Sequence, residues 1–141
     1  MNREILFGGK RLDNGEWVTG RLITDDRDGK EFIVSWIGYH CEEGIDSVNR
    51  YIECFGFEVD PETVGQYTGL KDRNGVKIWE GDVFHLDDPN ILYVVAWQDA
   101  GFVGRQRGNR SSVGLSYWAP YLEKVGNVHD NPELLEVLGD G

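Results

Sequence analysis

The chain has 141 residues and a formal net charge of -11 at pH 7, because 25 Asp and Glu outnumber 14 Lys and Arg. This acidity disfavours nucleic-acid binding, since affinity for a phosphate backbone depends largely on basic side chains that displace counterions. Hydrophobic residues make up 40% and aromatic residues 12% of the chain, enough for one compact domain or two very small ones. Nineteen Gly and only four Pro are typical of tight turns between short strands, so the composition predicts a β-rich protein.

The cysteines and the N-terminus bear on the cell compartment. Cys41 and Cys54 lack C-x-x-C or zinc-ligand spacing, so we expect reduced thiols, with a disulfide as the alternative. The first residues lack the apolar run of a signal peptide, and no segment approaches the roughly 20 apolar residues that span a bilayer. We therefore expect a soluble cytoplasmic protein that does not contact a membrane.

A β-hairpin is predicted at the start of the chain. Apolar or β-favouring residues at 5–7 and 17–19 flank Asp13-Asn14-Gly15, which has hairpin-turn chemistry. Gly8-Gly9 in the first arm predicts a bulge or a close approach of another backbone. The acidic loop at 25–29 lacks the spaced ligands and terminal Glu of an EF-hand, so we expect a solvated loop without a metal.

Two further strands are predicted before residue 60. Residues 31–39 are aromatic and β-branched throughout, as in a strand buried on much of both faces, and residues 40–49 are polar and predict a loop. Residues 51–59 alternate, which predicts a strand with a mainly aromatic inner face. Asp60-Pro61 ends this strand, because proline cannot donate to a sheet.

A second hairpin is predicted around Asp72-Arg73-Asn74-Gly75. Asn-Gly suits a two-residue loop, whereas Asp at the first and Gly at the fourth position suit a type I turn that closes on a left-handed glycine. The two alternatives place Leu70 opposite Trp79 or opposite Ile78, so the sequence leaves the register open.

Strands and one helix are predicted for the rest of the chain. Residues 83–86, 91–97, 102–104 and 124–129 have strand character, and the continuously apolar 91–97 is expected at the centre of a second sheet. Residues 105–112 are polar and predict a loop, whereas 113–122 are apolar again. Asn131 as N-cap and Pro132 at the first helical position predict a short helix, with Leu134, Leu135 and Leu138 as its apolar stripe.

Two separated segments resemble a known family. Residues 65–84, GQYTGLKDRNGVKIWEGDVF, and residues 125–135, VGNVHDNPELL, are similar to the signature segments of the YopX-like proteins of bacteriophages and prophages. Residues 3–17 are similar to the usual opening of that family. The resemblance implies a β-rich, oligomeric phage protein in the bacterial cytoplasm, and it implies no catalytic residue.

The signature residues are expected to have structural roles. They are Gly65, Tyr67, Thr68, Gly69, Leu70, Asp72, Asn74, Gly75, Glu80, Gly81, Asp82, Gly126, Asn127, Asn131 and Pro132. We expect the two signature segments to pack together, with the leucines of the terminal helix covering Tyr67, Leu70, Ile78 and Trp79.

Candidate catalytic or metal-binding groups have simpler explanations in this sequence. Carboxylates can divide acid and base roles or bind a hard cation, but Glu80 and Asp82 enter a strand, and Asp87-Asp88 has ordinary turn chemistry. His40, Cys41 and Cys54 lack paired ligand spacing, and His129 precedes the predicted helix. No nucleophile motif or phosphate-binding glycine pattern is present, so we expect neither an enzyme nor a cofactor.

Arg105, Arg107 and Arg110 form the one concentrated basic group, between aromatic residues that end at Phe102 and begin near Tyr117-Trp118. Arginines bind phosphates or carboxylates in bidentate fashion, and nearby rings can stack on bases. The alternatives are a solvated loop tip and a contact with acidic groups of a neighbouring subunit.

The sequence therefore predicts a mainly β protein, with an N-terminal β-hairpin region at residues 1–60 and a small SH3-like β-barrel with a short C-terminal helix at 61–141. The two parts are alternatively one continuous domain. The leading functional prediction is a non-enzymatic accessory protein that acts as a homo-oligomer and through contacts with a host or phage protein. The alternative is a nucleic-acid-binding barrel that uses the three arginines.

Overall fold

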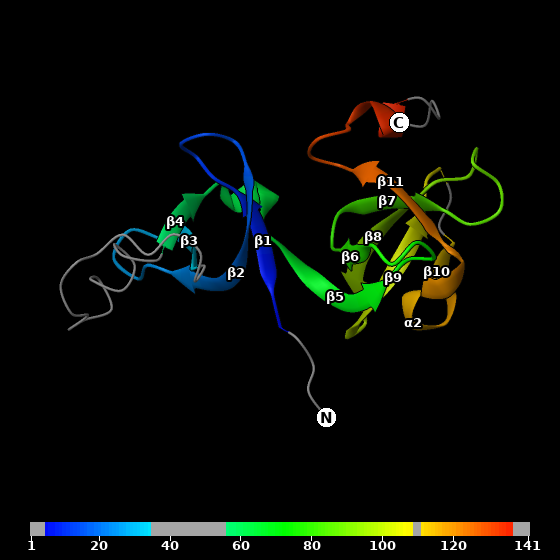
Figure 1. Cartoon of the computed structure of the whole chain (residues 1–141), viewed down its shortest axis with the longest axis horizontal. Helices are drawn as coiled ribbons and strands as arrows, with labels where there is room; N and C mark the ends of the chain where they lie inside the picture. The colour runs from blue at the N-terminus through cyan, green and yellow to red at the C-terminus, as the bar shows by residue number, and fades with distance from the viewer. Residues whose placement is uncertain (1–4, 35–55, 109–110, 137–141) are drawn as a thin grey trace. The chain divides into compact units, whose positions relative to one another are not determined.

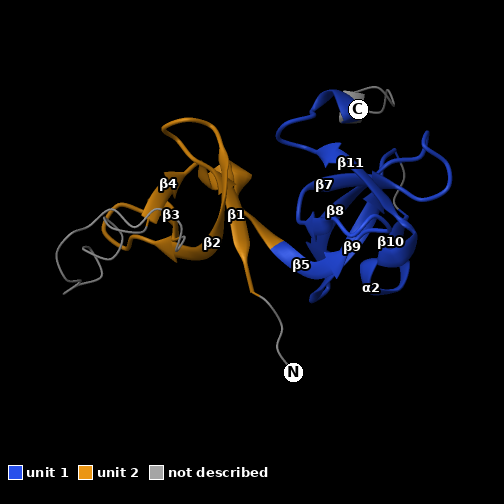
Figure 2. Cartoon of the chain, viewed as in Figure 1, with its two compact units in different colours: residues 1–3, 67–141 blue, residues 4–66 orange. Residues whose placement is uncertain are grey.

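The computed structural model describes residues 5–34, 56–108 and 111–136 (Figure 1). The chain divides into two compact units, which Figure 2 colours separately: unit 1 contains residues 1–3 and 67–141, and unit 2 contains residues 4–66. The division falls inside strand β5 (Gly65–Lys71), beyond the boundary predicted at residue 60. Antiparallel strands dominate the described residues, which confirms the prediction of a mainly β protein with a short C-terminal helix.

Unit 2 is an antiparallel sheet whose strands follow chain order. Its strands are β1 (Phe7–Lys10), β2 (Trp17–Thr24), β3 (Glu31–Val34) and β4 (Gly56–Val59), followed by the 3-10 turn η1 (Pro61–Thr63). Each of these strands pairs with the next, and the first two residues of β5 pair with the other side of β1. The remainder of the predicted strands 31–39 and 51–59, and the predicted loop between them, lie outside the described residues.

The sheet of unit 2 curls back toward its own start. Arg11, just after β1, forms a bridge with Val59 at the end of β4. Leu12 N donates to Glu58 O at 3.0 Å, and Asp60 N donates to Lys10 O at 2.9 Å. Both edges of β4 are therefore hydrogen-bonded, which removes an open strand edge that could pair with another chain.

Neither alternative predicted for Gly8-Gly9, a bulge or the approach of another backbone, describes Gly9, whose close neighbour is the side chain of Val59. β1 pairs with β2 residue for residue, without a bulge. A Cβ atom at Gly9 would lie 3.1 Å from Val59 Cβ, so a side chain at this position would press on the buried strand β4. Gly9 thus lets the curled sheet pack on itself around Ile33, Val34 and Val59.

Unit 1 combines a hairpin with an open five-stranded sheet. Its elements are β5 from Tyr67, β6 (Lys77–Trp79), β7 (Asp82–His85), β8 (Tyr93–Gln98), β9 (Gly101–Gln106), β10 (Ser112–Gly114), α2 (Leu115–Trp118), η2 (Ala119–Tyr121), β11 (Glu123–Asn127) and α3 (Glu133–Glu136). The strand order is β10-β9-β8-β7-β11, so β8 is central, as predicted for residues 91–97. Because β10 and β11 end the sheet on opposite sides, the predicted closure into an SH3-like barrel is not observed.

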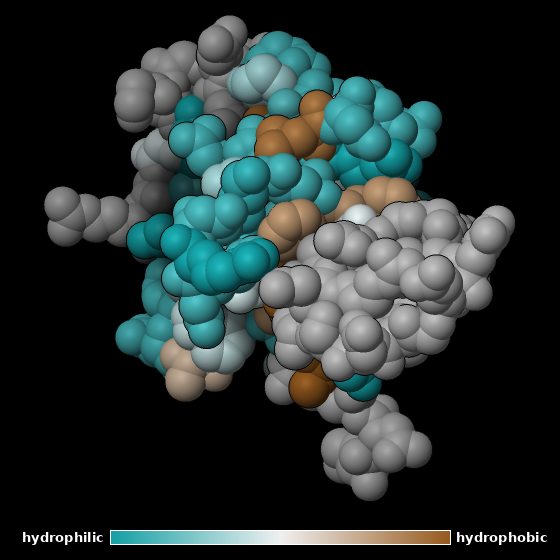
Figure 3. Space-filling model, turned by 90° about the vertical axis from the view of Figure 1, so that its left-hand side faces the viewer, coloured by the Kyte–Doolittle hydropathy of each residue, from teal (hydrophilic) through white to brown (hydrophobic). Residues whose placement is uncertain are grey.

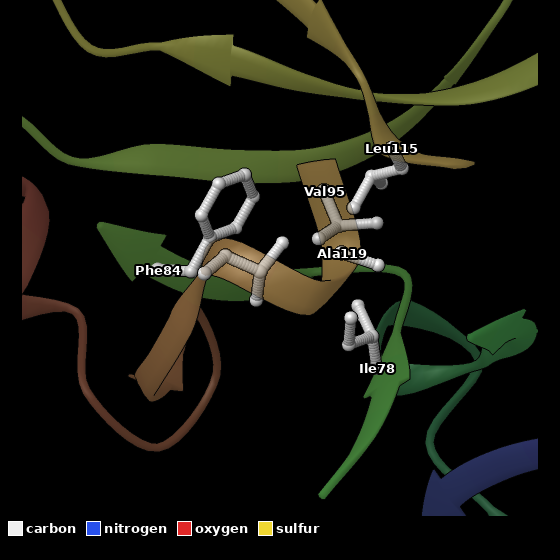
Figure 4. Close-up of a cluster of buried hydrophobic side chains, with 6 residues drawn as sticks. Ile78, Phe84, Val95, Leu115 and Ala119 are labelled. Carbon is white, nitrogen blue, oxygen red and sulfur yellow. The ribbon is translucent and has the colours of Figure 1, made fainter. Parts of the chain in front are cut away.

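The core of unit 1 lies between this sheet, the hairpin and the two short helical turns (Figure 4). Leu115, Ala119 and Leu122 are almost fully buried and come from α2, η2 and the residue after them. Their spacing places them on one side of a helical segment, where they meet Ile78, Phe84 and Val95. The apolar character of residues 113–122 does not by itself predict these helical turns.

Next to its turn, the β5–β6 hairpin has the predicted register that places Leu70 opposite Ile78, because Lys71 lies opposite Lys77. The register shifts further along, where Tyr67 lies opposite Trp79, so three residues of β5 face the single residue Ile78. Gly69 has a φ of 85°, and Thr68 Oγ1 donates to Ile78 O at 2.8 Å, which fills the ladder position that the bulge leaves. The turn itself is the type I alternative: Gly75 N donates to Asp72 O at 3.0 Å, and Gly75 has a φ of 80°.

The terminal helix does not have the expected packing. Leu134 Cδ1 lies 3.0 Å from the Cβ position of Gly126 in β11, and Leu134 is not among the side chains packed on the core around Ile78. The side chain of Leu135 and all of Leu138 lie outside the described residues. The hairpin is instead covered by the core side chains of α2 and η2, so the predicted cover by the helix is wrong for its described part.

Candidate interaction surface

Three aromatic side chains face outward from α2 and η2. Tyr117, Trp118 and Tyr121 are 69%, 37% and 56% exposed, whereas the opposite face of the same segment supplies the buried core residues. The outward face of a helical segment is ordinarily polar. We call these three side chains the aromatic surface.

The rings of the aromatic surface touch one another. The ring centroids of Tyr117 and Trp118 are 5.1 Å apart, those of Trp118 and Tyr121 are 6.0 Å apart, and those of Tyr117 and Tyr121 are 6.2 Å apart. The planes are tilted by 81°, 69° and 39°, so the cluster is an uneven apolar patch and not a stack. Tyr and Trp combine a large apolar area with a polar group, which makes them common at protein interfaces.

The sequence named Tyr117 and Trp118 as possible stacking partners but missed Tyr121 and the outward orientation of all three. The signal was present in the spacing of Leu115, Ala119 and Leu122, which predicts one buried face and thereby an exposed opposite face.

On the face of the molecule shown in Figure 3, the coloured residues are mostly hydrophilic, and the hydrophobic ones form small separate groups.

The arginine group is only partly described. Arg105 is exposed in β9, opposite Ser112 of β10, so it belongs to a strand and not to the predicted loop. Arg107 is half-buried in the following turn, where its N donates to Leu92 O at 2.9 Å. Arg110 lies outside the described residues. Arg105 and Arg107 therefore differ in exposure, and the binding role of the three arginines stays a prediction.

The candidate carboxylates have different environments. Asp82 is buried in β7, whereas Asp87 and Asp88 are exposed in the turn before β8, where Asp88 Oδ1 accepts from Asn90 N at 2.9 Å. Within residues 5–34, 56–108 and 111–136, no group of three or more His, Cys, Asp or Glu is arranged to hold a metal ion. His40, Cys41 and Cys54 are outside these ranges, and His129 lies beside Gly81.

Three signature side chains accept hydrogen bonds from backbone groups at turns and strand edges of unit 1. Asp72 Oδ2 accepts from Lys124 N at 3.0 Å, and Asn131 Oδ1 accepts from Asn127 N at 3.2 Å, both on the edge strand β11. Asp82 Oδ2 accepts from Trp79 N at the end of β6 at 2.7 Å. Such caps satisfy N–H groups that would otherwise be available to a strand of another molecule.

Asp72 is a carboxylate surrounded by backbone donors. Its Oδ1 accepts from Asn74 N at 2.8 Å and from Val76 N at 2.9 Å, in addition to the Lys124 bond on Oδ2. Burial acts to raise the pKa of Asp72, but the backbone donors outweigh it, so its pKa lies below the ordinary value. Asp72 thereby fixes the hairpin turn and ties it to β11.

Asp82 has the opposite balance. Burial raises the pKa of Asp82 to about 6, although Lys124 Nζ lies 3.1 Å from Asp82 Oδ2 and acts to lower it. The hydrogen bond from Trp79 N also acts to lower the pKa of Asp82, but Asp82 has no second backbone donor of this kind. Asp82 joins the end of β6, the start of β7 and β11, which is the arrangement of a structural residue.

The two signature segments do meet, although not through the described part of the helix. Val128 N donates to Gly81 O at 2.9 Å, and a Cβ at Gly81 would lie 3.6 Å from both Val128 Cγ2 and His129 Nε2. At Gly126 a Cβ would clash with Asn131 Oδ1 at 2.5 Å. Gly81 also has a φ of 91°, so its backbone conformation favours glycine, although the space around it would accept a Cβ.

These observations define an acidic, mainly β protein whose buried polar side chains secure turns and strand edges, and whose described surface carries an aromatic patch. The chain belongs to the YopX protein family, whose family model matches residues 7–136. The resemblance seen in the signature segments is thereby confirmed.

One solved structure is similar in fold. The crystal structure of protein EF1440 from Enterococcus faecalis matches with a TM-score of 0.56 and 23% sequence identity, over 96% of this chain and 100% of that chain. At this identity the similarity shows a shared fold and no more. Comparison with curated proteins gives no match. Within the described residues, no helix is long and apolar enough to cross a membrane.

Proposed function

We propose that the chain is a non-enzymatic accessory protein of a phage or prophage, which acts in the host cytoplasm through self-assembly and through contacts with a host or phage protein. The aromatic surface is the contact site in this proposal. This proposal rests on one observation. Three touching rings are exposed on the face of the α2–η2 segment that lies opposite its buried residues.

The size and chemistry of this patch support a binding role. A Tyr or Trp residue buries roughly 150–250 Å² when it is fully covered, and contiguous exposed apolar patches larger than a few hundred Å² commonly mark interaction sites. Burial of such rings contributes much of the binding energy at protein interfaces, where Trp and Tyr are common hot spots. The buried carboxylates Asp72 and Asp82, in contrast, are engaged by backbone donors and Lys124.

The triple substitution Tyr117→Ser, Trp118→Ser and Tyr121→Ser tests self-assembly. Size-exclusion chromatography with light scattering at micromolar concentration should give a mass above 16.0 kDa for the unmodified protein and a monomer for this variant. The matched control is Val76→Ser, Ile91→Ser and Val125→Ser, which removes three exposed apolar side chains of the same unit that lie outside the aromatic surface. A monomeric unmodified protein contradicts self-assembly, and a monomeric control contradicts the choice of surface.

Contacts with another protein are tested by affinity capture from phage-infected cells with the same three proteins as bait. The proposal expects a partner that binds the unmodified protein and the control but not the aromatic variant. Equal capture by all three contradicts the role of the aromatic surface. A salt-sensitive gel shift that is lost in Arg105→Ala, Arg107→Ala and Arg110→Ala would instead favour the nucleic-acid alternative.

A further inference from the structure

His85 of β7 has an oxygen atom in front of each ring nitrogen. Its Nδ1 lies 2.9 Å from Leu86 O, and its Nε2 lies 3.0 Å from Oε1 of Glu123, the residue directly opposite on β11. The side chain is only 11% exposed, so water has little access to the ring.

These contacts determine how many protons the ring must hold. A carbonyl oxygen and a carboxylate oxygen only accept hydrogen bonds, whereas a neutral imidazole has a single N–H. Either neutral tautomer would therefore point a lone pair at an acceptor about 3 Å away, which is unfavourable in a buried site. The doubly protonated ring donates to both oxygens and satisfies the arrangement.

A proton on Glu123 would be the other way to satisfy Nε2, but Arg73 opposes it. Arg73 Nη2 lies 2.8 Å from the same Glu123 Oε1, and a guanidinium favours the ionised carboxylate. Glu123 therefore lies between the guanidinium of Arg73, from the β5–β6 turn, and the ring of His85, from β7.

Arg73 also contacts, through its backbone, the segment that carries the aromatic surface. Arg73 N donates to Leu122 O at 3.0 Å, and Leu122 directly follows Tyr121. The neighbouring charges are paired in a second group, in which Lys124 contacts Asp82 through its side chain and Asp72 through its backbone. Glu123 and Arg73 are thus the charged groups that face His85 from β11 and from the turn.

We propose that Arg73, Glu123 and His85 form a proton-dependent clamp that fixes the C-terminal end of the α2–η2 segment. The clamp is closed while His85 holds two protons and opens as rising pH removes one of them, because the neutral ring must turn away from Glu123 or from Leu86 O. This inference goes beyond the proposed function and does not depend on what binds the aromatic surface.

Nuclear magnetic resonance of the full ¹⁵N-labelled chain tests the clamp. Histidine ordinarily titrates near pH 6.5, so a series from roughly pH 5 to 9 covers the loss of the second proton. The ring nitrogens of His85 should change from two protonated signals to one over the same pH interval in which the protection of the Arg73 amide falls about tenfold, as expected for loss of one hydrogen bond. Protection here is the intrinsic, base-catalysed exchange rate divided by the measured rate at the same pH. A neutral His85 throughout the series, or deprotonation without change at Arg73, overturns the clamp.

Two variants with one control keep the test specific. His85→Gln should remove the pH-dependent change at Arg73, whereas His129→Gln should leave it unchanged. If His85→Gln does not fold, Glu123→Gln serves as the second variant, because its amide NH2 can donate to Nε2 of a neutral ring and the pH-dependent change at Arg73 should then be lost. The same change at Arg73 in Glu123→Gln as in the unmodified protein overturns the proposal.

Discussion

The turn at Asp72 and the turn at Asp82 use the same residue type in the same unit, with opposite electrostatic results. Both aspartates are buried, at 5% and 3% exposure, and both accept hydrogen bonds from the backbone. Asp72 has three backbone donors and a lowered pKa, whereas Asp82 has one backbone donor and Lys124, and its pKa is raised to about 6. The backbone donors thus outweigh burial at Asp72, whereas at Asp82 burial outweighs the one backbone donor and Lys124.

The difference separates two ways of holding a turn. Asp72 is stabilised as an anion, so its turn is most secure when the carboxyl group is ionised. Burial of Asp82 disfavours its ionised form, so the site is most stable when the carboxyl group of Asp82 carries a proton. The two sites should therefore respond to pH in opposite directions. Because Lys124 contacts both and the charge of Asp72 acts to raise the pKa of Asp82, each is tested by a substitution that leaves the other aspartate in place.

Replacing Asp72 with Ala should have the largest effect, because it leaves the N–H groups of Asn74, Val76 and Lys124 without their acceptor. We expect the free energy of unfolding to fall by roughly 3–5 kcal/mol, since bonds to a charged acceptor contribute about 1.5–3 kcal/mol each and are not additive. Urea unfolding near neutral pH measures the loss. A fall below about 1 kcal/mol would contradict this role of Asp72.

The isosteric variant Asp72→Asn distinguishes charge from shape. Its amide oxygen can accept from Asn74 N and Val76 N, but its NH2 group would face Lys124 N, so an intermediate loss is expected. Because the pKa of Asp72 is lowered on folding, its stabilisation is present above the ordinary value near 3.9 and is lost as pH falls through the lowered value. In Asp72→Asn, this loss of stability at low pH should be absent.

Asp82→Asn should remove a pH dependence of the opposite sign. The pKa of Asp82 rises from an ordinary value of 3.8 to about 6 on folding, so stability is highest below the ordinary value and falls as pH rises through about 6. The fall should be about 2–3 kcal/mol in the unmodified protein and absent in Asp82→Asn. Urea unfolding at intervals between about pH 4 and pH 7 provides the comparison. The same slope in both proteins would show that Asp82 does not resist ionisation.

Local patterns in the sequence predicted much of this framework. Asp72-Arg73-Asn74-Gly75 encodes its own turn, because the Asp acceptor and the left-handed Gly lie within a few residues of each other. The apolar run at 91–97 likewise predicted the central strand β8. In both places the information is contained in one short segment.

Contacts between distant residues were not predictable in the same way. The Arg11–Val59 bridge and the Lys124–Asp72 bond join segments far apart in the chain, so no local pattern specifies them. The two registers considered for the hairpin assumed a regular ladder, whereas Gly69 forms a bulge that Thr68 completes. The outward orientation of Tyr117 depends on what the opposite face of α2 packs against, which only the folded core supplies.

Asn131 is, after Asp72 and Asp82, the third side chain that accepts a hydrogen bond from a backbone group of unit 1, and Asn131→Ala should have the smallest effect. Asn131 is neutral and half-buried, and its bond to Asn127 N is 3.2 Å long, so we expect a loss of about 0.5–1.5 kcal/mol in the free energy of unfolding. Asn131 N also donates to Asn127 O at 2.9 Å, and this backbone bond survives the substitution. Amide hydrogen exchange at Asn127 should therefore accelerate while that at Lys124 is unchanged. Equal acceleration at both amides would mean that β11 opens as a whole, and that Asp72 and Asn131 do not act as separate caps.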